Sequence, residues 1–329
     1  MRAQDSATAT RTIAVTAPEE STSGRTAADR SASRQRASGR KPSDPRVRGT
    51  LLALLGVVAF SLTFPSTVWG LESFGPWSLV AVRSTLAALI AGTFLLAGRV
   101  PLPERRHWAG LAVVAGGVVI GFPLLTTLAL QTSTTSHAAV VVGLLPLTTA
   151  TLAAIRTGRR PSRTFWFAAV AGAVVVIAFT LQQSGGAVSQ GDLYLFGALL
   201  VCAAGYTEGG RLASLMPGWQ VIGWALVLCL PLMAVASVVT LSIEPAHLTA
   251  HGVIGLAWVA VGSTFCGLYV WYRGMAEIGI PKASQLQLAQ PLLTLFWSVF
   301  LLGETLPLAA PLAAVGVLVC IAVTQRAKS

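Results

Sequence analysis

Charged residues are scarce in this chain of 329 residues. Asp, Glu, Lys and Arg make up 11% of the sequence, whereas 54% is hydrophobic and the mean hydropathy is +0.70. Soluble domains carry about 25% charged residues, so an ordinary water-soluble protein is excluded. The net charge of +11 comes from basic residues scattered between long apolar runs. Because no helix has a basic face, no nucleic-acid partner is expected. The composition indicates an integral membrane protein in a lipid bilayer.

Motifs for metals, cofactors and catalysis are also missing. The four cysteines stand far apart, each inside an apolar run, so neither a disulfide framework nor a metal site is indicated. No phosphate-binding GxxxxGK[ST], HExxH or nucleophile-elbow pattern occurs. A membrane-embedded enzyme would need clustered His, Asp or Glu at one interface, and the sequence has no such cluster. We therefore expect no cofactor, no metal and no enzymatic activity.

Residues 1–48 differ from the rest of the chain. They hold nine Arg, one Lys and five acidic residues, and they lack the apolar core that a secretory signal needs. The five acids also argue against an organelle transit peptide. Because it has few apolar residues to bury, this segment is predicted to be a disordered basic cytoplasmic tail. One interpretation places this tail in contact with anionic lipid.

From Gly49 onward, long apolar runs follow one another with short loops. About 20 residues are needed to cross roughly 30 Å of hydrocarbon as a helix. The sequence therefore predicts ten transmembrane helices, at 49–69, 77–97, 108–128, 136–155, 164–182, 192–209, 219–241, 251–271, 280–302 and 306–324.

The distribution of Lys and Arg sets the expected orientation. With a cytoplasmic tail, one side of the membrane receives twelve basic residues and the other receives none. The twelve are Arg99, Arg105, Arg106, Arg156, Arg159, Arg160, Arg163, Arg211, Arg273, Lys282, Arg326 and Lys328. This asymmetry predicts a multi-pass protein of the plasma membrane with both termini cytoplasmic.

An internal repeat relates the two halves of the chain. A shift of 145 residues places Pro146 on Pro291, Thr149 on Thr294 and Gly158 on Gly303. Since each half then holds an odd number of spans, the second half must enter the membrane from the opposite side. We predict two inverted five-helix repeats, at 49–182 and 192–324, with the substrate site between them.

Several motifs lie in a characteristic order. Residues 262–276 read GSTFCGLYVWYRGMA, and Ala283-Ser284, Gln290-Pro291 and Leu302-Gly303-Glu304 follow them. Together with Arg83 and Pro146, this pattern resembles the EamA-type members of the drug/metabolite transporter superfamily over residues 50–325. The first half departs from the pattern, because it reads Arg156-Thr-Gly-Arg-Arg160 where many relatives carry Gly-Glu.

This resemblance implies a ten-helix secondary transporter that works without nucleotide hydrolysis. Its expected substrates are small metabolites, amino acids or amphiphilic compounds, and its expected direction is export. A nucleotide-sugar or sugar-phosphate carrier is an alternative, although it would need several cationic side chains deep in the membrane to bind phosphate. A membrane scaffold or sensor that transports nothing is another.

Polar residues inside the spans are the candidates for the substrate cavity, because each is costly in hydrocarbon. Arg83 either extends to the headgroups or places a fixed positive charge in the cavity. In the ninth span, Ser284, Gln287 and Thr294 share one helix face, and Gln290 stands beside it. This face either lines the cavity or joins helices.

The remaining candidates are aromatic side chains and one histidine. Phe60, Phe64, Tyr206, Phe265 and Tyr269 lie mid-span, where they either line the cavity or pack. His137, at the start of the fourth span, either couples a proton or is simply solvated. Glu208 and Glu304 are interpreted as ordinary carboxylates at a helix start or in a loop.

Overall fold

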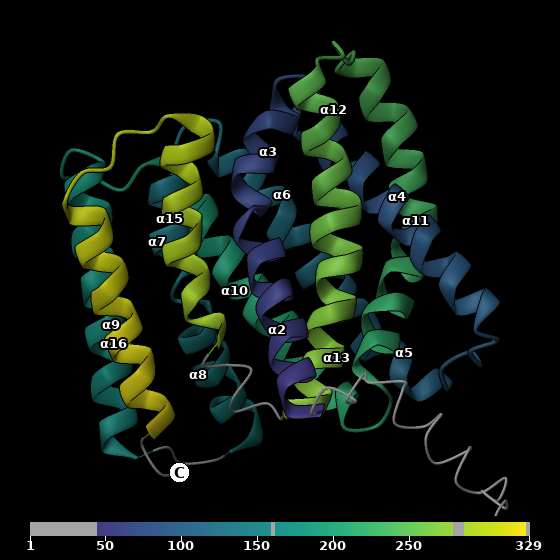
Figure 1. Ribbon diagram of the computed structural model, residues 1–329, viewed down its shortest axis with the longest axis horizontal. Helices are drawn as coiled ribbons and strands as arrows, with labels where there is room; N and C mark the ends of the chain where they lie inside the picture. Colours follow the sequence, from purple (N-terminus) through teal and green to yellow (C-terminus); the bar gives the residue numbers. More distant parts are fainter. Residues whose placement is uncertain (1–44, 159–161, 279–285, 327–329) are drawn as a thin grey trace, which may run out of the picture. The chain divides into compact units, whose positions relative to one another are not determined.

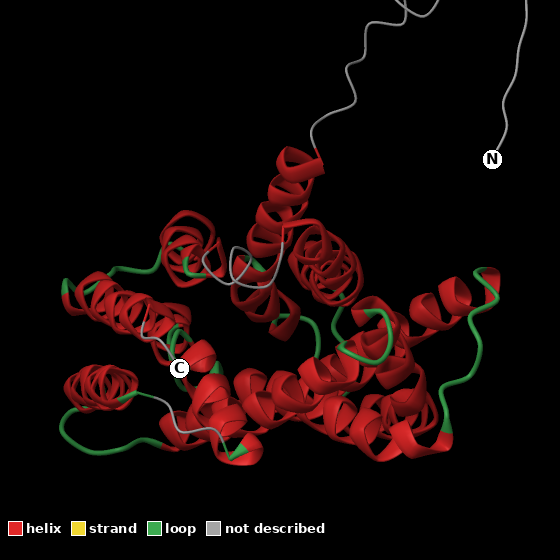
Figure 2. Cartoon of the chain, turned by 90° about the horizontal axis from the view of Figure 1, so that it is seen from below, coloured by secondary structure: helices red, strands yellow, loops and turns green. Residues whose placement is uncertain are grey.

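The computed structural model describes residues 45–158, 162–278 and 286–326, and this part of the chain contains helices and no strand (Figures 1 and 2). Most of the predicted tail, residues 1–44, lies outside the described residues. The first described helix starts at Pro45, four residues before the predicted start of the first span at Gly49.

The described helices of the first half follow the predicted spans closely. They are α2 (Pro45–Ser61), α3 (Thr63–Leu71), α4 (Pro76–Ala97), η1 (Arg105–His107), α5 (Trp108–Val114), η2 (Ala115–Gly121), α6 (Phe122–Ala129), α7 (Thr135–Val142), α8 (Leu145–Thr157) and α9 (Arg163–Gln183). Those of the second half are α10 (Gln190–Ala213), α11 (Gly218–Ile243), α12 (Ala250–Ala257), η3 (Trp258–Gly267), α13 (Leu268–Ile278), α15 (Ala289–Leu302) and α16 (Ala309–Arg326).

Eight helical stretches in the described residues are long and apolar enough to cross a membrane. They correspond to the first eight predicted spans. Two shorter apolar helices, 289–302 and 309–323, lie within the ninth and tenth. The predicted beginning of the ninth span, 280–285, lies outside the described residues. The protein is therefore an all-helical, multi-pass membrane protein.

Several spans are interrupted at positions that the sequence marks with proline or glycine. The first is broken between Ser61 and Thr63, just before Pro65, and the fourth is broken at Gly143–Leu144, just before Pro146. Proline cannot donate the backbone hydrogen bond of a helix interior, so these breaks are expected. The third and eighth spans contain π-helical segments, η2 and η3, and hydropathy gave no sign of either.

Helices from the two halves pack in pairs. Figure 1 shows α4 beside α11, α2 beside α13, and α9 beside α16, and these pairs make the most extensive two-helix contacts among the described elements. The third span packs along α10, where glycines permit close approach: a Cβ on Gly117 would overlap the carbonyl oxygen of Val201. This packing leaves a space between α3, α7, α8, α10 and α15, where the candidate site lies.

Candidate functional site

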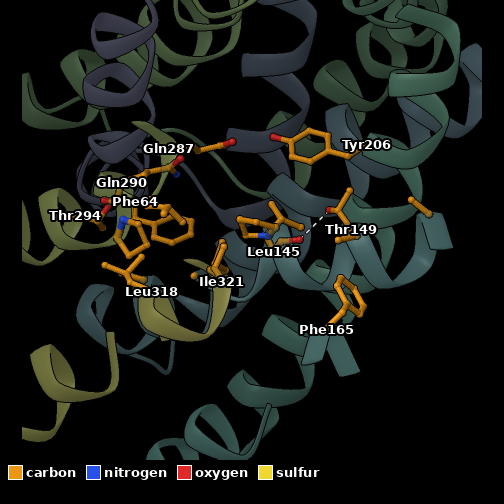
Figure 3. A pocket seen from close by; sticks show the side chains of 18 residues that line it. Phe64, Leu145, Thr149, Phe165, Tyr206, Gln287, Gln290, Thr294, Leu318 and Ile321 are labelled. Atoms are coloured by element: carbon orange, nitrogen blue, oxygen red, sulfur yellow. Dashed lines mark hydrogen bonds between the residues drawn. The ribbon is translucent and has the colours of Figure 1, made fainter. Parts of the chain in front are cut away.

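A cavity of about 450 Å³ lies between helices of both halves. Its wall is mostly apolar, with a few hydroxyl and amide groups. The lining residues with larger or polar side chains are Phe64, Leu145, Thr149, Phe165, Tyr206, Gln287, Gln290, Thr294, Leu318 and Ile321 (Figure 3). In Figure 3, the Gln287 amide and the Tyr206 hydroxyl point toward each other from opposite sides.

The helix breaks explain why polar backbone reaches this wall. Pro146 stands near the start of α8 and Pro291 near the start of α15, and both line the cavity. Neither proline has an N–H for the carbonyl four residues earlier, at Val142 and Gln287. Gly143 and Pro291 lie next to each other across the cavity wall, since a Cβ on Gly143 would be in van der Waals contact with Pro291 Cγ, at 3.4 Å.

Thr294 has a structural partner as well as a place on the wall. Its hydroxyl donates toward Ser61 O and toward Gln290 O, at 3.0 Å each. In a regular helix Ser61 O would accept from residue 65, but Pro65 has no N–H. Thr294 is only 3% exposed. Its hydroxyl therefore supplies the hydrogen bond that the Ser61 carbonyl lacks at the break between α2 and α3, and it joins α15 to the first span.

A second, smaller cavity of about 100 Å³ adjoins the first. The two share the lining residues Phe64, Val142, Leu145, Tyr206, Gln287, Gln290 and Thr294. The smaller cavity adds Phe60, Arg83 and several hydroxyl groups from η3 and neighbouring helices. We call the two together the central cavity.

Arg83 is buried on the wall of the central cavity, with 6% of its surface exposed. Its Nη2 donates to Thr264 Oγ1 at 3.0 Å and toward Val259 O at 3.5 Å. Thr264 also donates to Val259 O, at 2.6 Å across the π-helical segment η3. The guanidinium thus points into the protein, and the alternative in which it extends to the headgroups does not describe this structure.

Phe265 and Tyr269 do not line the central cavity. They lie around a separate space of about 30 Å³ between α4, α11 and the eighth span, where Phe265 packs on Phe94 at 4.8 Å between ring centroids. Tyr269 is partly exposed, and its hydroxyl accepts a hydrogen bond from Arg273 at 3.3 Å. The predicted Ser284 lies outside the described residues.

His137 is neither on the cavity wall nor solvated. Its ring is 6% exposed, and Nε2 lies 2.6 Å from Asp192 Oδ1. The other carboxylate oxygen of Asp192 accepts hydrogen bonds from Ser184 Oγ and from Ser189 N and Oγ, at 2.7–2.8 Å. The interpretation of His137 as a solvated side chain is therefore wrong, because this cluster buries it.

The interpretation of Glu208 as a helix-start or loop carboxylate is also wrong. It lies in the last turns of α10, 3% exposed, with ion pairs to Arg156 at 2.7 Å and Arg211 at 2.5 Å. Glu304 does follow a helix, and its two oxygens accept hydrogen bonds from Thr135 N and Ser136 N, at 2.7 and 3.0 Å. It thereby caps the start of α7 from the end of α15.

Sequence reasoning missed Thr149, whose hydroxyl faces the cavity region and donates to Leu145 O at 2.8 Å (Figure 3). The repeat could have found it, because the 145-residue shift pairs Thr149 with Thr294. Asp192 had a local signal too. Ser189 and Asp192 form a reciprocal capping box at the start of α10, which their spacing of three predicts.

Comparison with known proteins gives the family. The profile of the EamA-like transporter family matches the chain twice, at residues 47–181 and 189–325. The chain belongs to this family. A similar curated protein, "Uncharacterized transporter YdeK" of Bacillus subtilis (strain 168), is 41% identical over 281 residues, which cover 84% of this chain and 97% of that protein.

A solved structure supports the fold of this EamA-like chain. A crystal structure named only "Crystal structure of protein" matches 84% of this chain and 98% of its own, with a TM-score of 0.58 and 21% identity. At that identity the likeness concerns the fold alone. The family and the curated relative confirm the predicted resemblance. They identify the chain as a membrane transporter, which acts on a small-molecule substrate in a lipid bilayer.

Proposed function

We propose that this chain is a secondary transporter that exports small metabolites, amino acids or amphiphilic compounds by alternating access. In this proposal ten spans form two inverted five-helix repeats, 49–182 and 192–324. The observation that carries it is the composition of the central cavity. Two of its lining pairs, Pro146 with Pro291 and Thr149 with Thr294, are related by the 145-residue shift, as a site between two repeats requires.

Backbone features support the same repeat. Gly158 and Gly303, also 145 residues apart, end α8 and α15 in the left-handed conformation, with φ of 65° and 66°. The third and eighth spans each carry a π-helical segment, and α9 packs on α16, its counterpart. These correspondences favour a duplicated five-helix unit whose halves exchange roles during the cycle.

The cavity extends toward the end of the helices that bears the basic residues. Its lining includes Ala153 near the end of α8, Phe165 near the start of α9 and Ile321 near the end of α16. At the other end of the fourth span, Glu304 caps α7 and His137 pairs with Asp192. With both termini cytoplasmic, as proposed, this arrangement corresponds to an inward-open carrier in the plasma membrane.

The rival carrier of nucleotide sugars or sugar phosphates is not favoured. Among the described residues, Arg83 is the one cation on the wall of the central cavity. A phosphate dianion calls for several such groups. The wall instead offers aromatic rings, hydroxyls and amides, which suit small amphiphilic molecules.

Transport from defined liposomes tests the proposal. The full chain, reconstituted and loaded with a panel of amino acids, amines, sugars and nucleosides, should deplete some members selectively, as measured by mass spectrometry of the lumen. Ala153→Trp, which fills the cavity, should abolish that depletion. Ala171→Trp, on an exposed position of α9, is the matched control and should transport normally. Equal retention of every compound by protein and empty liposomes would contradict the proposal.

A further inference from the structure

The guanidinium of Arg83 carries a buried positive charge that the described protein does not balance. Its two hydrogen-bond acceptors, Thr264 Oγ1 and Val259 O, are neutral. The ion pairs of the described residues involve Arg48, Arg106, Arg156, Arg211, His137 and His251, and Arg83 is in none of them. A buried charge without a counter-ion is costly, and buried charges are normally paired.

Arg83 also keeps hydrogen-bonding capacity for a ligand. A guanidinium has five N–H donors, and both hydrogen bonds of Arg83, to Val259 O and Thr264 Oγ1, come from Nη2. Within the described part of the chain, Nε and Nη1 therefore have no assigned acceptor, which leaves three donors. Because the residue lines the central cavity, a carboxylate that enters the cavity can reach this charge.

The groups around Arg83 fit a carboxylate head. Ser84, Ser263 and Thr63 line the same part of the cavity, and the hydroxyls of Thr63 and Ser263 lie 2.7 Å apart. Because one of these two hydroxyls donates to the other, the second keeps its proton for a carboxylate oxygen beside the guanidinium. The Ser84 hydroxyl makes a long hydrogen bond, to Val119 O at 3.4 Å, and can turn to the same ligand. The three hydroxyls also keep the wall polar where a ligand would lose water.

The rest of the wall fits an apolar body with one further polar group. Phe60 and Phe64 give aromatic surface next to the polar end, and Gln287 and Gln290 offer amide groups toward the larger space. Since the described wall holds one cation and no carboxylate, it matches a single negative charge.

From this juxtaposition we infer that Arg83 is the carboxylate-binding residue of the cavity, and that the ligand is a small amphiphilic monocarboxylate. This inference rests on the proposed transport function, because it names the substrate class of the same cavity. The carboxylate replaces the missing counter-ion of Arg83, its apolar body contacts the phenylalanines, and any distal polar group meets the glutamine amides.

Matched acid and amide probes test this inference by binding alone. The purified full chain is titrated with benzoate and benzamide, and with hydrocinnamate and hydrocinnamamide, while thermal unfolding is followed. At least one acid should stabilise the protein, with an affinity about tenfold or more above that of its amide. Arg83→Gln should remove that preference, whereas Arg83→Lys should retain part of it.

Arg106→Gln is the control, because this exposed arginine lies outside the central cavity and forms an ion pair with the exposed Glu104. It should leave the acid preference unchanged. Amides that bind as tightly as acids, an unchanged preference in Arg83→Gln, or no binding by any acid would each overturn the inference. If Arg83→Gln fails to fold, the acid-to-amide ratios of the wild-type and Arg83→Lys proteins decide the question.

Liposome transport separates failure of this inference from failure of the proposed function. Selective depletion of neutral or cationic compounds, without any acid, would keep the transport function and overturn the carboxylate site. An acid that binds through Arg83 but never crosses the liposome membrane would support the site and contradict the transport function.

Discussion

The imidazole of His137 and the carboxylate of Asp192 form a buried pair, with Nε2 and Oδ1 separated by 2.6 Å. His137 lies in the first turn of α7, and Asp192 lies in the first turn of α10. Ser184, just after α9, donates to the second oxygen of the same carboxylate. Three helices are thereby joined at one end, around a carboxylate that has no exposed surface.

Replacing Asp192 by Ala should destabilise the protein by about 1–3 kcal/mol, because the partners left behind are buried and unsatisfied. Thermal unfolding of the purified protein measures the loss. The His251–Glu72 pair is a matched control, since it is exposed and 3.5 Å long. Glu72→Ala should cost about 0–1 kcal/mol. Equal losses of stability in the two variants would show that the buried pair stabilises the protein no more than the exposed pair does.

Replacing Gln287 or Gln290 by Leu should preserve folding and reduce transport. Each amide lines the central cavity, and a polar substrate group that loses its partner binds more weakly by about 1–3 kcal/mol, or roughly 5- to 150-fold. Transport at matched protein abundance measures the effect. Phe300→Leu, at an exposed position of α15, should transport normally. Normal transport by both glutamine variants would identify this face as packing surface.

Thr294→Val should lower thermal stability, because Ser61 O loses the hydroxyl that replaces the missing Pro65 N–H. Hydrogen bonds between membrane helices contribute about 0.6 kcal/mol on average and up to about 1.7, so we expect a loss in this range. Thr294→Ser should restore most of it. Thr93→Val is the control, since the Thr93 hydroxyl bonds within its own helix at an exposed position. A larger loss for Thr93→Val than for Thr294→Val would refute this role.

Gly158→Ala and Gly303→Ala should each cost about 1–2 kcal/mol, because an L side chain is strained at their positive φ. A Cβ meets nothing within 4 Å at either site, so the loss reports backbone strain alone. Gly116→Ala has equally open space without positive φ, and it should be neutral or stabilising by about 0.4–1 kcal/mol. Thermal unfolding of the three variants compares them, and equal changes would exclude backbone strain as the cause.

Much of the helical architecture is predictable because the bilayer imposes it. Hydropathy and the twenty-residue requirement locate the helices to within a few residues, and polar groups inside them mark cavity positions such as Gln287 and Gln290. Contacts across long sequence separations are different. His137 and Asp192 are 55 residues apart, and no local pattern pairs a buried histidine with that particular carboxylate.

The eighth span shows a second reason for the failures. Phe265 and Tyr269 are candidates from the sequence because they lie mid-span, but η3 is π-helical from Trp258 to Gly267. A π-helical turn holds extra residues and rotates the residues that follow it. Ser263 and Thr264 consequently line the central cavity, while Phe265 and Tyr269 lie around a separate space. Hydropathy alone does not reveal where a helix changes its hydrogen-bonding pattern.

The glycines that end α8 and α15 adopt the same left-handed conformation, but residues of opposite charge follow them. Gly303 is followed by Glu304, which caps α7, whereas Gly158 is followed in sequence by Arg159 and Arg160. In the proposed inverted arrangement, two identical repeats would give inward- and outward-facing states of equal energy. Here the turn at Gly303 supplies an acidic cap, whereas basic residues follow Gly158 in the sequence. In that proposed arrangement, the unequal residues at the two turns would make one state of the empty carrier lower in energy than the other, before any substrate binds.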